Sequence, residues 1–600
     1  MAKRPINYTS RDFESIKTDL ENYAKRYYPT TFKDFSEASF GALMLDLVAY
    51  VGDQLSFYAD FQTNESFIDS AIRYDSVVRL SEAMGYKNQG AAKSTGQVAI
   101  YILVPVSANS RTPDVSYFPI LQKGSIVSGD NGATYTLISD VDFTNPNNEI
   151  TVARTDATTG NPTYFAVKAF AQVVSGQQFE EQIDIGNYQR FLTATIDDAN
   201  VTEIISVKDS QGNEYYEVEN LSQDVVLAQV KNVDNSTRDS SPYSMRVKPV
   251  PRRFVTSFNT SVDGTVTLQF GYGSENNLTG DLVADPADVV LNVSSKPYVT
   301  ETTFDPTNLI RTDKFGVVPT NTTLTIIYTA NTTDTANASV GSVTRLVSPN
   351  LLFSNRQELS EAIISTIVSS IEVDNEEPIL GDTEQLLADE IKIRAFGTYA
   401  AQNRAVTRED YTNLAYRMPG KFGKIKRANV VRDDNSLKRN LNMYVLSEDI
   451  LGNLTAPNSV LKDNLRVWLD NYRMINDTID ILDGKVINIG IRYEIIPDLD
   501  INRFDLLEQC NQILQEDFLT IKFGLGESVY LSQVYKVLND VPGVTDVKNV
   551  EFYNITGGLY SNYVYDIDSN ISNDGRYLRV PSDSAAEVLF PGTDILGVIS

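Results

Sequence analysis

Acidic side chains are the residues whose number and spacing best suit chemistry in this sequence. The segments VDNEEPILGDTE and PDLD carry seven of them: Asp374, Glu376, Glu377, Asp382, Glu384, Asp498 and Asp500. A pair of carboxylates is the machinery of glycoside hydrolysis, which needs no histidine. Both segments also stand where helices are expected to begin, and acidic side chains favour a helix N-terminus for electrostatic reasons alone. Hydrolysis by Glu376 and Glu384 is therefore kept only as an alternative.

The 600-residue sequence contains no histidine and a single cysteine. It therefore has no Ser-His-Asp or Cys-His nucleophile, no histidine-ligated zinc site and no histidine pH switch. One cysteine allows neither an internal disulfide nor an all-cysteine metal cluster. Cys510 lies in the apolar helical sequence FDLLEQCNQIL, which predicts a buried, inert thiol. We expect no cofactor and no enzymatic activity.

Two kinds of loop partly match known ligand-binding motifs. The segment DIDSNISNDG, from Asp566, begins like a calcium loop but has Ile571 at the sixth position and Tyr577 at the twelfth, where Gly and Glu are needed. A looser cation site there stays open. The glycine turns FGYGSE and KFGLGESVY lack the lysine and the spacing of phosphate-binding loops. Turn geometry is sufficient to explain them.

The formal net charge of -28 arises from 79 acidic and 51 basic side chains. Such a surface repels phosphate, so it argues against a nucleic acid or an anionic membrane as the main partner. The densest basic group is Lys421, Lys424, Lys426 and Arg427, which we interpret as a solvated strand edge. No apolar stretch follows the start MAKRPINYTSRDF, so no signal peptide is predicted and we expect assembly in the cytoplasm.

The elements that must position any functional surface begin with three predicted helices before residue 90. The second is unusual, because SFGALMLDLVAYVGDQLSFYADF (39–61) is apolar on two adjacent stripes about 100° apart, with Asp46, Asp53 and Asp60 on the remainder. Two stripes need helices on both sides. We therefore expect part of the burial to come from another chain, with a purely internal bundle as the alternative. The expected partner-binding residues are Phe40, Leu43, Met44, Leu47, Val48, Tyr50, Val51, Leu55 and Tyr58.

The rest of the chain predicts a multidomain α+β protein. The N-terminal helical bundle segment covers 1–90, with Ser10 or Thr9 capping the first helix, Ser36 the second, and a third helix running from Asn64 or Ser66 to Gly85. A large antiparallel β-rich region follows, then a helical connector, then C-terminal α+β units with an extended tail. The expected boundaries are 91–345, 346–423, 424–555 and 556–600. The tail has few apolar residues, so we expect an arm lying on a neighbouring chain.

Several segments, in their order along the chain, resemble the baseplate wedge proteins of contractile-tailed phages, the baseplate-J-like family. The likeness is greatest to the T-even-type wedge subunit of the inner baseplate ring, and it covers roughly residues 8 to 553. The segments are FGALMLDLVAYVGDQLSFYADFQTNESFIDSAIRYDSVVRLSEAMGY, LQKGSIVSGDNGATYTLISD, FGYGS, RTDKFGVVPTNTTLTIIY, AAQNRAVTREDYTNLAYRMPGKFGKI and SQVYKVLNDVPGVTDV. The sequence departs from the family at Tyr272, where many relatives have Asp, and it is shorter than the T-even subunit.

The resemblance implies a structural, non-catalytic protein of the virion. In that family two copies of this subunit and one larger wedge subunit join through N-terminal helices into a bundle, for which this sequence offers the nine residues named above. Six wedges then close into a ring through C-terminal contacts, and the assembly relays contraction to the sheath. The segment Arg404–Tyr411 would belong to the middle region and Val541–Val544 to the C-terminal unit. The implied partners are a second copy, the larger wedge subunit, neighbouring wedges, and sheath-initiator and other baseplate proteins.

Two other classes of function stay open beside this one. A tail-associated adhesin or carbohydrate-binding module using the β region would show trimeric repeats or an exposed aromatic patch. A glycoside hydrolase would use the acidic pair described first. A structural protein would have to switch by bistable packing, because the sequence contains no histidine trigger.

Overall fold

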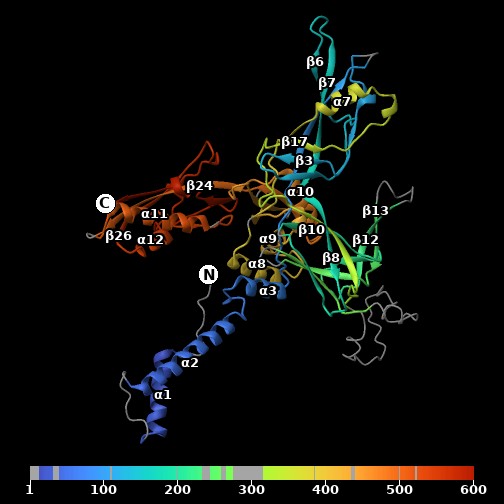
Figure 1. Cartoon of the computed structure of the whole chain (residues 1–600). Helices are drawn as coiled ribbons and strands as arrows, with labels where there is room; N and C mark the ends of the chain where they lie inside the picture. Colours follow the sequence, from blue (N-terminus) through green and yellow to red (C-terminus); the bar gives the residue numbers. More distant parts are fainter. Residues whose placement is uncertain are drawn as a thin grey trace. The chain divides into compact units, whose positions relative to one another are not determined.

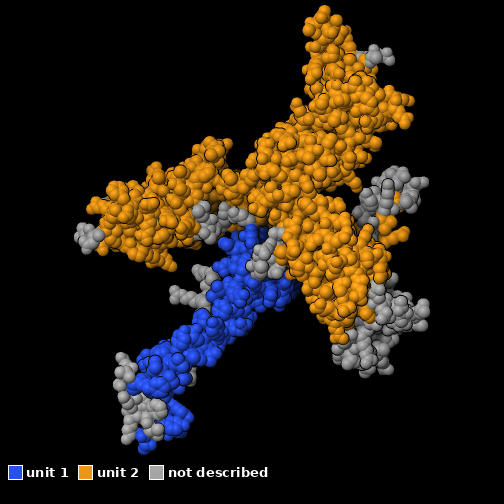
Figure 2. All heavy atoms as spheres, in the orientation of Figure 1, with its two compact units in different colours: residues 1–88, 384–417, 472–474 blue, residues 89–383, 418–471, 475–600 orange. Residues whose placement is uncertain are grey.

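The computed structural model divides the chain into two compact units (Figure 2). Unit 1 comprises 1–88, 384–417 and 472–474, and unit 2 comprises 89–383, 418–471 and 475–600. The structure describes the following residues: 12–30, 39–107, 111–198, 200–232, 243–258, 265–274, 315–383, 385–433, 440–498, 501–520 and 523–599.

Unit 1 is helical (Figure 1). Its helices are α1 (Phe13–Tyr27), α2 (Phe40–Asn64), α3 (Tyr74–Ala83), α8 (Ala388–Ala401) and α9 (Arg408–Tyr416). α8 packs against α3 and α9, and its buried side chains Ile391 and Ala395 complete a small core with Val77 and Val78 of α3. Residues near 390 therefore complete the fold of the N-terminal helices.

The helix starts differ from the sequence prediction. Asp12 caps α1 through a reciprocal hydrogen bond with Ser15, whereas the predicted caps Ser10 and Thr9 lie outside the described residues. Ser39, and not Ser36, caps α2, because its hydroxyl accepts the N–H of Ala42 at 3.1 Å. In both cases the side chain that bonds the free amides of the first turn lies closer to the helix than predicted.

The third helix is shorter than predicted and starts at Tyr74. The carboxylate of Glu65 accepts the N–H groups of Ile72 and Arg73, which holds residues 65–73 in successive turns. A carboxylate that binds backbone amides competes with the helix for them. The predicted stop is confirmed, since Gly85 adopts a φ of 93°, which favours glycine.

The first sheet of unit 2 has the order β17-β3-β4-β7-β1-β19, with β6 pairing β7. The strands are β1 (Thr95–Pro105), β3 (Ile126–Gly129), β4 (Thr134–Leu137), β6 (Glu149–Thr155), β7 (Pro162–Ser175), β17 (Val343–Ser348) and β19 (Glu372–Asp374). Alternate side chains of β1 and β7 face one core, which α7 (Glu361–Ser369) covers with Ile364 and Ile367. A small sheet of β18 (Leu351–Leu352), β2 (Ile120–Leu121) and β5 (Val141–Asp142) adjoins this core.

The second sheet of unit 2 has the order β8-β16-β10-β11-β14-β15-β9. The strands are β8 (Gln177–Ile185), β9 (Thr193–Ile196), β10 (Val201–Asp209), β11 (Glu214–Glu217), β14 (Arg253–Phe258), β15 (Val266–Phe270) and β16 (Thr322–Ala330). Between β11 and β14 the chain forms a separate hairpin of β12 (Val225–Lys231) and β13 (Tyr243–Pro249).

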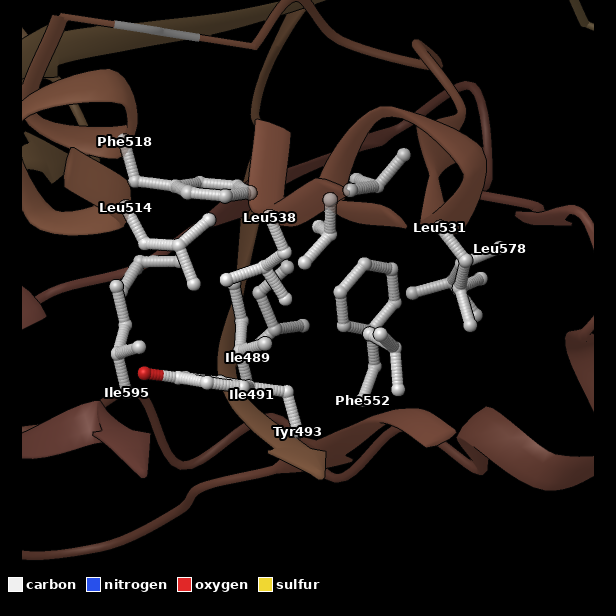
Figure 3. Packing of buried hydrophobic residues seen from close by; sticks show 14 of the residues in the cluster. Ile489, Ile491, Tyr493, Leu514, Phe518, Leu531, Leu538, Phe552, Leu578 and Ile595 are labelled. Atoms are coloured by element: carbon white, nitrogen blue, oxygen red, sulfur yellow. The ribbon is translucent and has the colours of Figure 1, made fainter. Parts of the chain in front are cut away.

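The last part of unit 2 alternates strands and helices, as the sequence predicts. Its elements are β20 (Arg427–Arg432), β21 (Asn440–Glu448), β22 (Leu454–Thr455), α10 (Ser459–Asp470), β23 (Thr478–Asp483), β24 (Lys485–Pro497), α11 (Arg503–Thr520), β25 (Val529–Tyr530), α12 (Leu531–Asn539) and β26 (Val544–Asn554). One face of β24 packs Ile489, Ile491 and Tyr493 against α11 and α12, as Figure 3 shows. The mixed α+β architecture, with N-terminal helices and antiparallel sheets, is confirmed.

The C-terminal segment is not an arm lying on a neighbouring chain, which corrects the prediction. Its strands β28 (Ser584–Glu587) and β29 (Ile595–Ile599) both pair in parallel with β24, and β27 (Tyr577–Leu578) pairs with β25. Leu578 and Ile595 enter the same core as Ile491. The segment is short of apolar residues because it completes a core that earlier residues supply. The other predicted domain boundaries stay predictions. Both α7 and β19 lie in the predicted helical connector, yet α7 packs on the core of the first sheet and β19 pairs with β1 in that sheet.

Candidate functional site

The second helix carries an apolar face that the described chain leaves exposed. All nine residues predicted to bind a partner have exposed side chains, from Met44 at 40% to Phe40 at 75%. At 100° per residue they lie within about 160° of the helix circumference. They are Phe40, Leu43, Met44, Leu47, Val48, Tyr50, Val51, Leu55 and Tyr58, and we call them the α2 apolar face.

The other side of α2, which carries the acidic line, packs against α1. Ala42 and Ala49 are buried, and a methyl group added at Gly52 would lie 3.2 Å from the side chain of Ile16. Asp46 pairs with Lys17 of α1 at 2.8 Å. Small residues let the two helices approach closely, and an ion pair satisfies the acid between them. The side of α2 that the two apolar stripes leave is therefore the intramolecular contact.

Exposed apolar patches of this kind on a folded protein mark interaction sites. The α2 apolar face holds large side chains at positions three and four residues apart, which is the arrangement that packs against further helices. Within the described residues, α1 is the element that packs on α2. The geometry therefore suits helix–helix association with another chain.

The acidic segment 374–384 is occupied by structural contacts where the structure describes it. Glu376 pairs with Lys168 and accepts the hydroxyl of Tyr101 at 3.3 Å. The hydrogen bond from Lys168 lowers the pKa of Glu376, which opposes a role as a general acid. Glu377 accepts the N–H and hydroxyl of Ser459 at the start of α10. Glu384 and Asp500 lie outside the described residues.

The loop from Asp566 and the glycine turns also serve local structure. Asp566 caps the short helix α13 (Ile567–Asn570), and Asp574 accepts the hydroxyl of Ser572 at 2.6 Å. In the FGYGS turn, a side chain at Gly271 would meet the carbonyl oxygen of Phe315 at 2.0 Å. Over the described parts of the chain, no group of three or more acidic or cysteine side chains is arranged to hold a metal ion.

An aromatic cluster surrounds that turn. The ring of Tyr272 contacts those of Phe191 and Phe315, with centroids 5.7 and 5.6 Å away, and its carbonyl accepts the hydroxyl of Tyr188. Tyr188 and Phe191 are exposed, which is the feature that the carbohydrate-binding alternative requires. The FGYGS sequence is nevertheless explained by packing, because Tyr272 takes part through its ring and backbone.

The basic group near residue 424 is not a solvated strand edge, which corrects the prediction. Lys426 is buried and pairs with the buried Glu448 at 2.6 Å. The guanidinium group of Arg427 is buried and donates to the carbonyls of Phe523 and Lys426. Lys424 donates to the carbonyl of Gly90 at 2.6 Å. These contacts of Lys424, Lys426 and Arg427 hold segments of the chain together.

The buried thiol prediction is confirmed. Cys510 is fully buried in α11, in the same core as Ile491 and Leu514. Burial raises the pKa of the thiol to about 11, so it is protonated at neutral pH and a poor nucleophile. Among the described helices, none combines the length and the apolar character needed to cross a membrane.

A polar junction inside unit 2 was missed by the sequence analysis. Asn337 accepts the hydroxyl of Ser94 and donates to the carbonyls of Asp382 and Glu448, at 2.8 to 3.0 Å. Asp382 donates its N–H back to Asn337 and accepts the N–H of Ala336. Burial raises the pKa of Asp382 against the opposing effects of the Ala336 hydrogen bond and the Lys424 charge. Nothing in the sequence brings residues 94, 337 and 448 together.

We expect Asp382→Asn to reduce the pH dependence of stability. A carboxyl whose folded pKa is raised stabilises the fold below its unfolded pKa of about 4, and this stability is lost as pH rises through the folded pKa. The asparagine side chain has the same shape and does not ionise. Denaturation of wild type and variant from pH 4 to pH 8, followed by the fluorescence of the single tryptophan Trp468, measures the difference. A difference in stability that is the same at every pH would contradict the ionisation of Asp382.

Comparison with known proteins gives one match to a family model. Residues 12–83, which span α1 to α3, match the N-terminal domain of bacteriophage baseplate protein. No curated protein sequence matches the chain.

Two examples of similar solved structures share little sequence with this chain. One is a chain of the anti-feeding prophage (AFP) baseplate, with 12% identity over 97% of this chain and 100% of that one, and a TM-score of 0.25. The other belongs to the type VI secretion system TssK-TssF-TssG baseplate subcomplex, with 10% identity over 74% of this chain and 96% of that one, and a TM-score of 0.26. Helices α1 to α3, of which α2 bears the α2 apolar face, are thus similar to the N-terminal domain of a bacteriophage baseplate protein. This match supports a role as a structural component of a baseplate.

Proposed function

We propose that this protein is a structural subunit of the baseplate wedge in a contractile phage tail. It associates with a second copy and with a larger wedge subunit through the α2 apolar face, and wedges joined in this way form the inner baseplate ring. In the virion it relays the contraction signal towards the sheath by changes in subunit contacts. Assembly takes place in the host cytoplasm, together with the sheath-initiator and other baseplate proteins.

The observation that carries this proposal is the exposure of the nine side chains of the α2 apolar face. Burying a large apolar side chain contributes roughly 1.5–3 kcal/mol of stabilising free energy. A chain that leaves such side chains in water lacks this contribution for each of them. Such a face is unfavourable in a lone chain, whereas a bundle of helices from several chains buries it. The family match to residues 12–83 covers the helix that bears it.

The mass of the purified chain, alone and mixed with the larger wedge subunit, tests the proposal directly. We expect a self-associated species for the chain alone and a larger complex containing both proteins after mixing. Analytical ultracentrifugation measures both. A strict monomer that does not bind the larger subunit would contradict the proposal.

A further inference from the structure

The β12–β13 hairpin exposes an apolar face of its own. The pairings Val225 with Pro249 and Leu227 with Val247 place these side chains on one face, together with Met245. Leu227 and Met245 are 68% and 66% exposed. Among the described strands, β12 and β13 pair only with each other. A two-stranded hairpin is marginally stable in water, so an outward apolar face is costly unless another surface covers it.

The root of the hairpin is firmly held. Arg253, which is buried, donates to the carbonyls of Leu221 and Val250, on the two sides of the hairpin. The N–H of Val250 donates to the carbonyl of Asp224 at 2.7 Å. Gly316, with a φ of 87°, leaves room for the Arg253 side chain, because an added methyl group would lie 2.8 Å from it. The hairpin is thus presented in a fixed position, which lowers the entropic cost of binding.

The charge of the hairpin is opposite to that of the chain. The strands VVLAQVK and YSMRVKP contain three basic residues and no acidic one, in a chain of net charge -28. The three are Lys231, Arg246 and Lys248. Arg246 and Lys248 alternate with Met245 and Val247 along β13, so they lie on the face of the hairpin opposite to Leu227 and Met245. An acidic surface is the complementary one.

The edge strand β8 offers such a surface. Its sequence QQFEEQIDI contains Glu180, Glu181 and Asp184 and no basic residue. Within the described sheet, β8 pairs only with β16, so its other edge is open to a further strand. Desolvation, together with the like charges of Asp197 and Asp198, raises the pKa of Glu181. A cationic strand placed beside β8 would relieve this repulsion.

We infer that the β12–β13 hairpin of one copy docks on the acidic β8 edge of a second copy. The inference rests on the proposed self-association, which it extends with a second contact outside the α2 apolar face. Because the two surfaces differ, the contact is heterologous, and a heterologous contact that closes generates a ring. The hairpin adds a strand to the sheet of its neighbour and buries Leu227 and Met245 there.

Charge exchange on the full-length chain tests this contact. We expect Arg246→Glu with Lys248→Glu to weaken association beyond the α2-mediated complex by about tenfold or more. Glu180→Lys with Asp184→Lys should do the same, and the chain carrying all four changes should recover association. Leu451→Asp, at a side chain 74% exposed in a turn far from both strands in sequence, is the control that should change nothing. Sedimentation velocity at low and high salt measures each.

The outcomes separate this contact from the proposed function. A photo-crosslinker in place of Leu227 should link to β8 of a second copy. Crosslinks from this position to the hairpin of the second copy would overturn the docking to β8. The docking would also be overturned if each pair of changes weakened association and the variant with all four changes did not recover it. Unchanged association in both charge variants would overturn the contact altogether. The proposed function is tested separately. A Leu47→Asp chain that still assembles normally would contradict it, whatever the result at the hairpin.

Discussion

Replacing Leu47 by aspartate is expected to prevent assembly while leaving the fold of the single chain intact. Leu47 lies near the middle of the α2 apolar face and is 57% exposed in the described chain. A carboxylate buried there by a partner would cost about 3 kcal/mol or more, which weakens association by about a hundredfold. In the isolated chain the same carboxylate lies in water, so the free energy of unfolding should change by no more than about 0.5 kcal/mol.

The test combines a mass measurement with a denaturation curve of the same sample. Leu47→Met keeps the size and apolar character of the side chain and should assemble like wild type. Lys17→Ala is a second control, because it removes the partner of Asp46 between α1 and α2 without touching the α2 apolar face. Normal assembly of Leu47→Asp would exclude this face as the bundle contact. A large loss of stability in the monomer would show that Leu47 is covered by its own chain.

The sequence predicted which residues of α2 are apolar and which are not, but not how the helix is oriented. The spacing of Phe40, Leu43 and Leu47 predicts an apolar stripe along the helix. From hydrophobicity alone, this stripe would be expected to pack against the neighbouring helix. In the structure α1 takes the side with Ala49 and Gly52 instead. Close approach of backbones favours small residues, and this leaves the large side chains exposed. A single sequence contains no signal that decides between these two arrangements.

Other features were missed because they depend on contacts between distant residues. The C-terminal segment looks like an arm by composition, yet β29 pairs with β24 about 100 residues earlier. Lys426 and Arg427 look like surface residues, yet Glu448 and the carbonyl of Phe523 satisfy them inside unit 2. Local patterns predicted the strands and helices after residue 424 well, because each spans a short stretch with its own period. They carry no information on which buried charge meets which partner.

The pair of Lys426 and Glu448 is the site where one substitution should cost most stability. Both side chains are at most 4% exposed, and their charged atoms lie 2.6 Å apart. Glu448→Leu leaves the ammonium group of Lys426 buried without this carboxylate, which we expect to destabilise unit 2 by about 3–5 kcal/mol. Trp468, the only tryptophan, lies in α10, which packs against β1 close to the same region, so its fluorescence reports the unfolding.

Two further variants decide whether the cost arises from the unpaired charge. Replacing both partners, with Lys426→Met added to Glu448→Leu, removes the buried charge and should recover most of the lost stability. Asp483→Asn breaks the more exposed pair with Lys462 of α10, at 3.0 Å, and should cost at most about 1 kcal/mol. If the double variant were as unstable as Glu448→Leu, the loss would come from packing or from the backbone contact of Glu448 with Asn337. In that case the polar junction, and not the ion pair, would hold this part of unit 2 together.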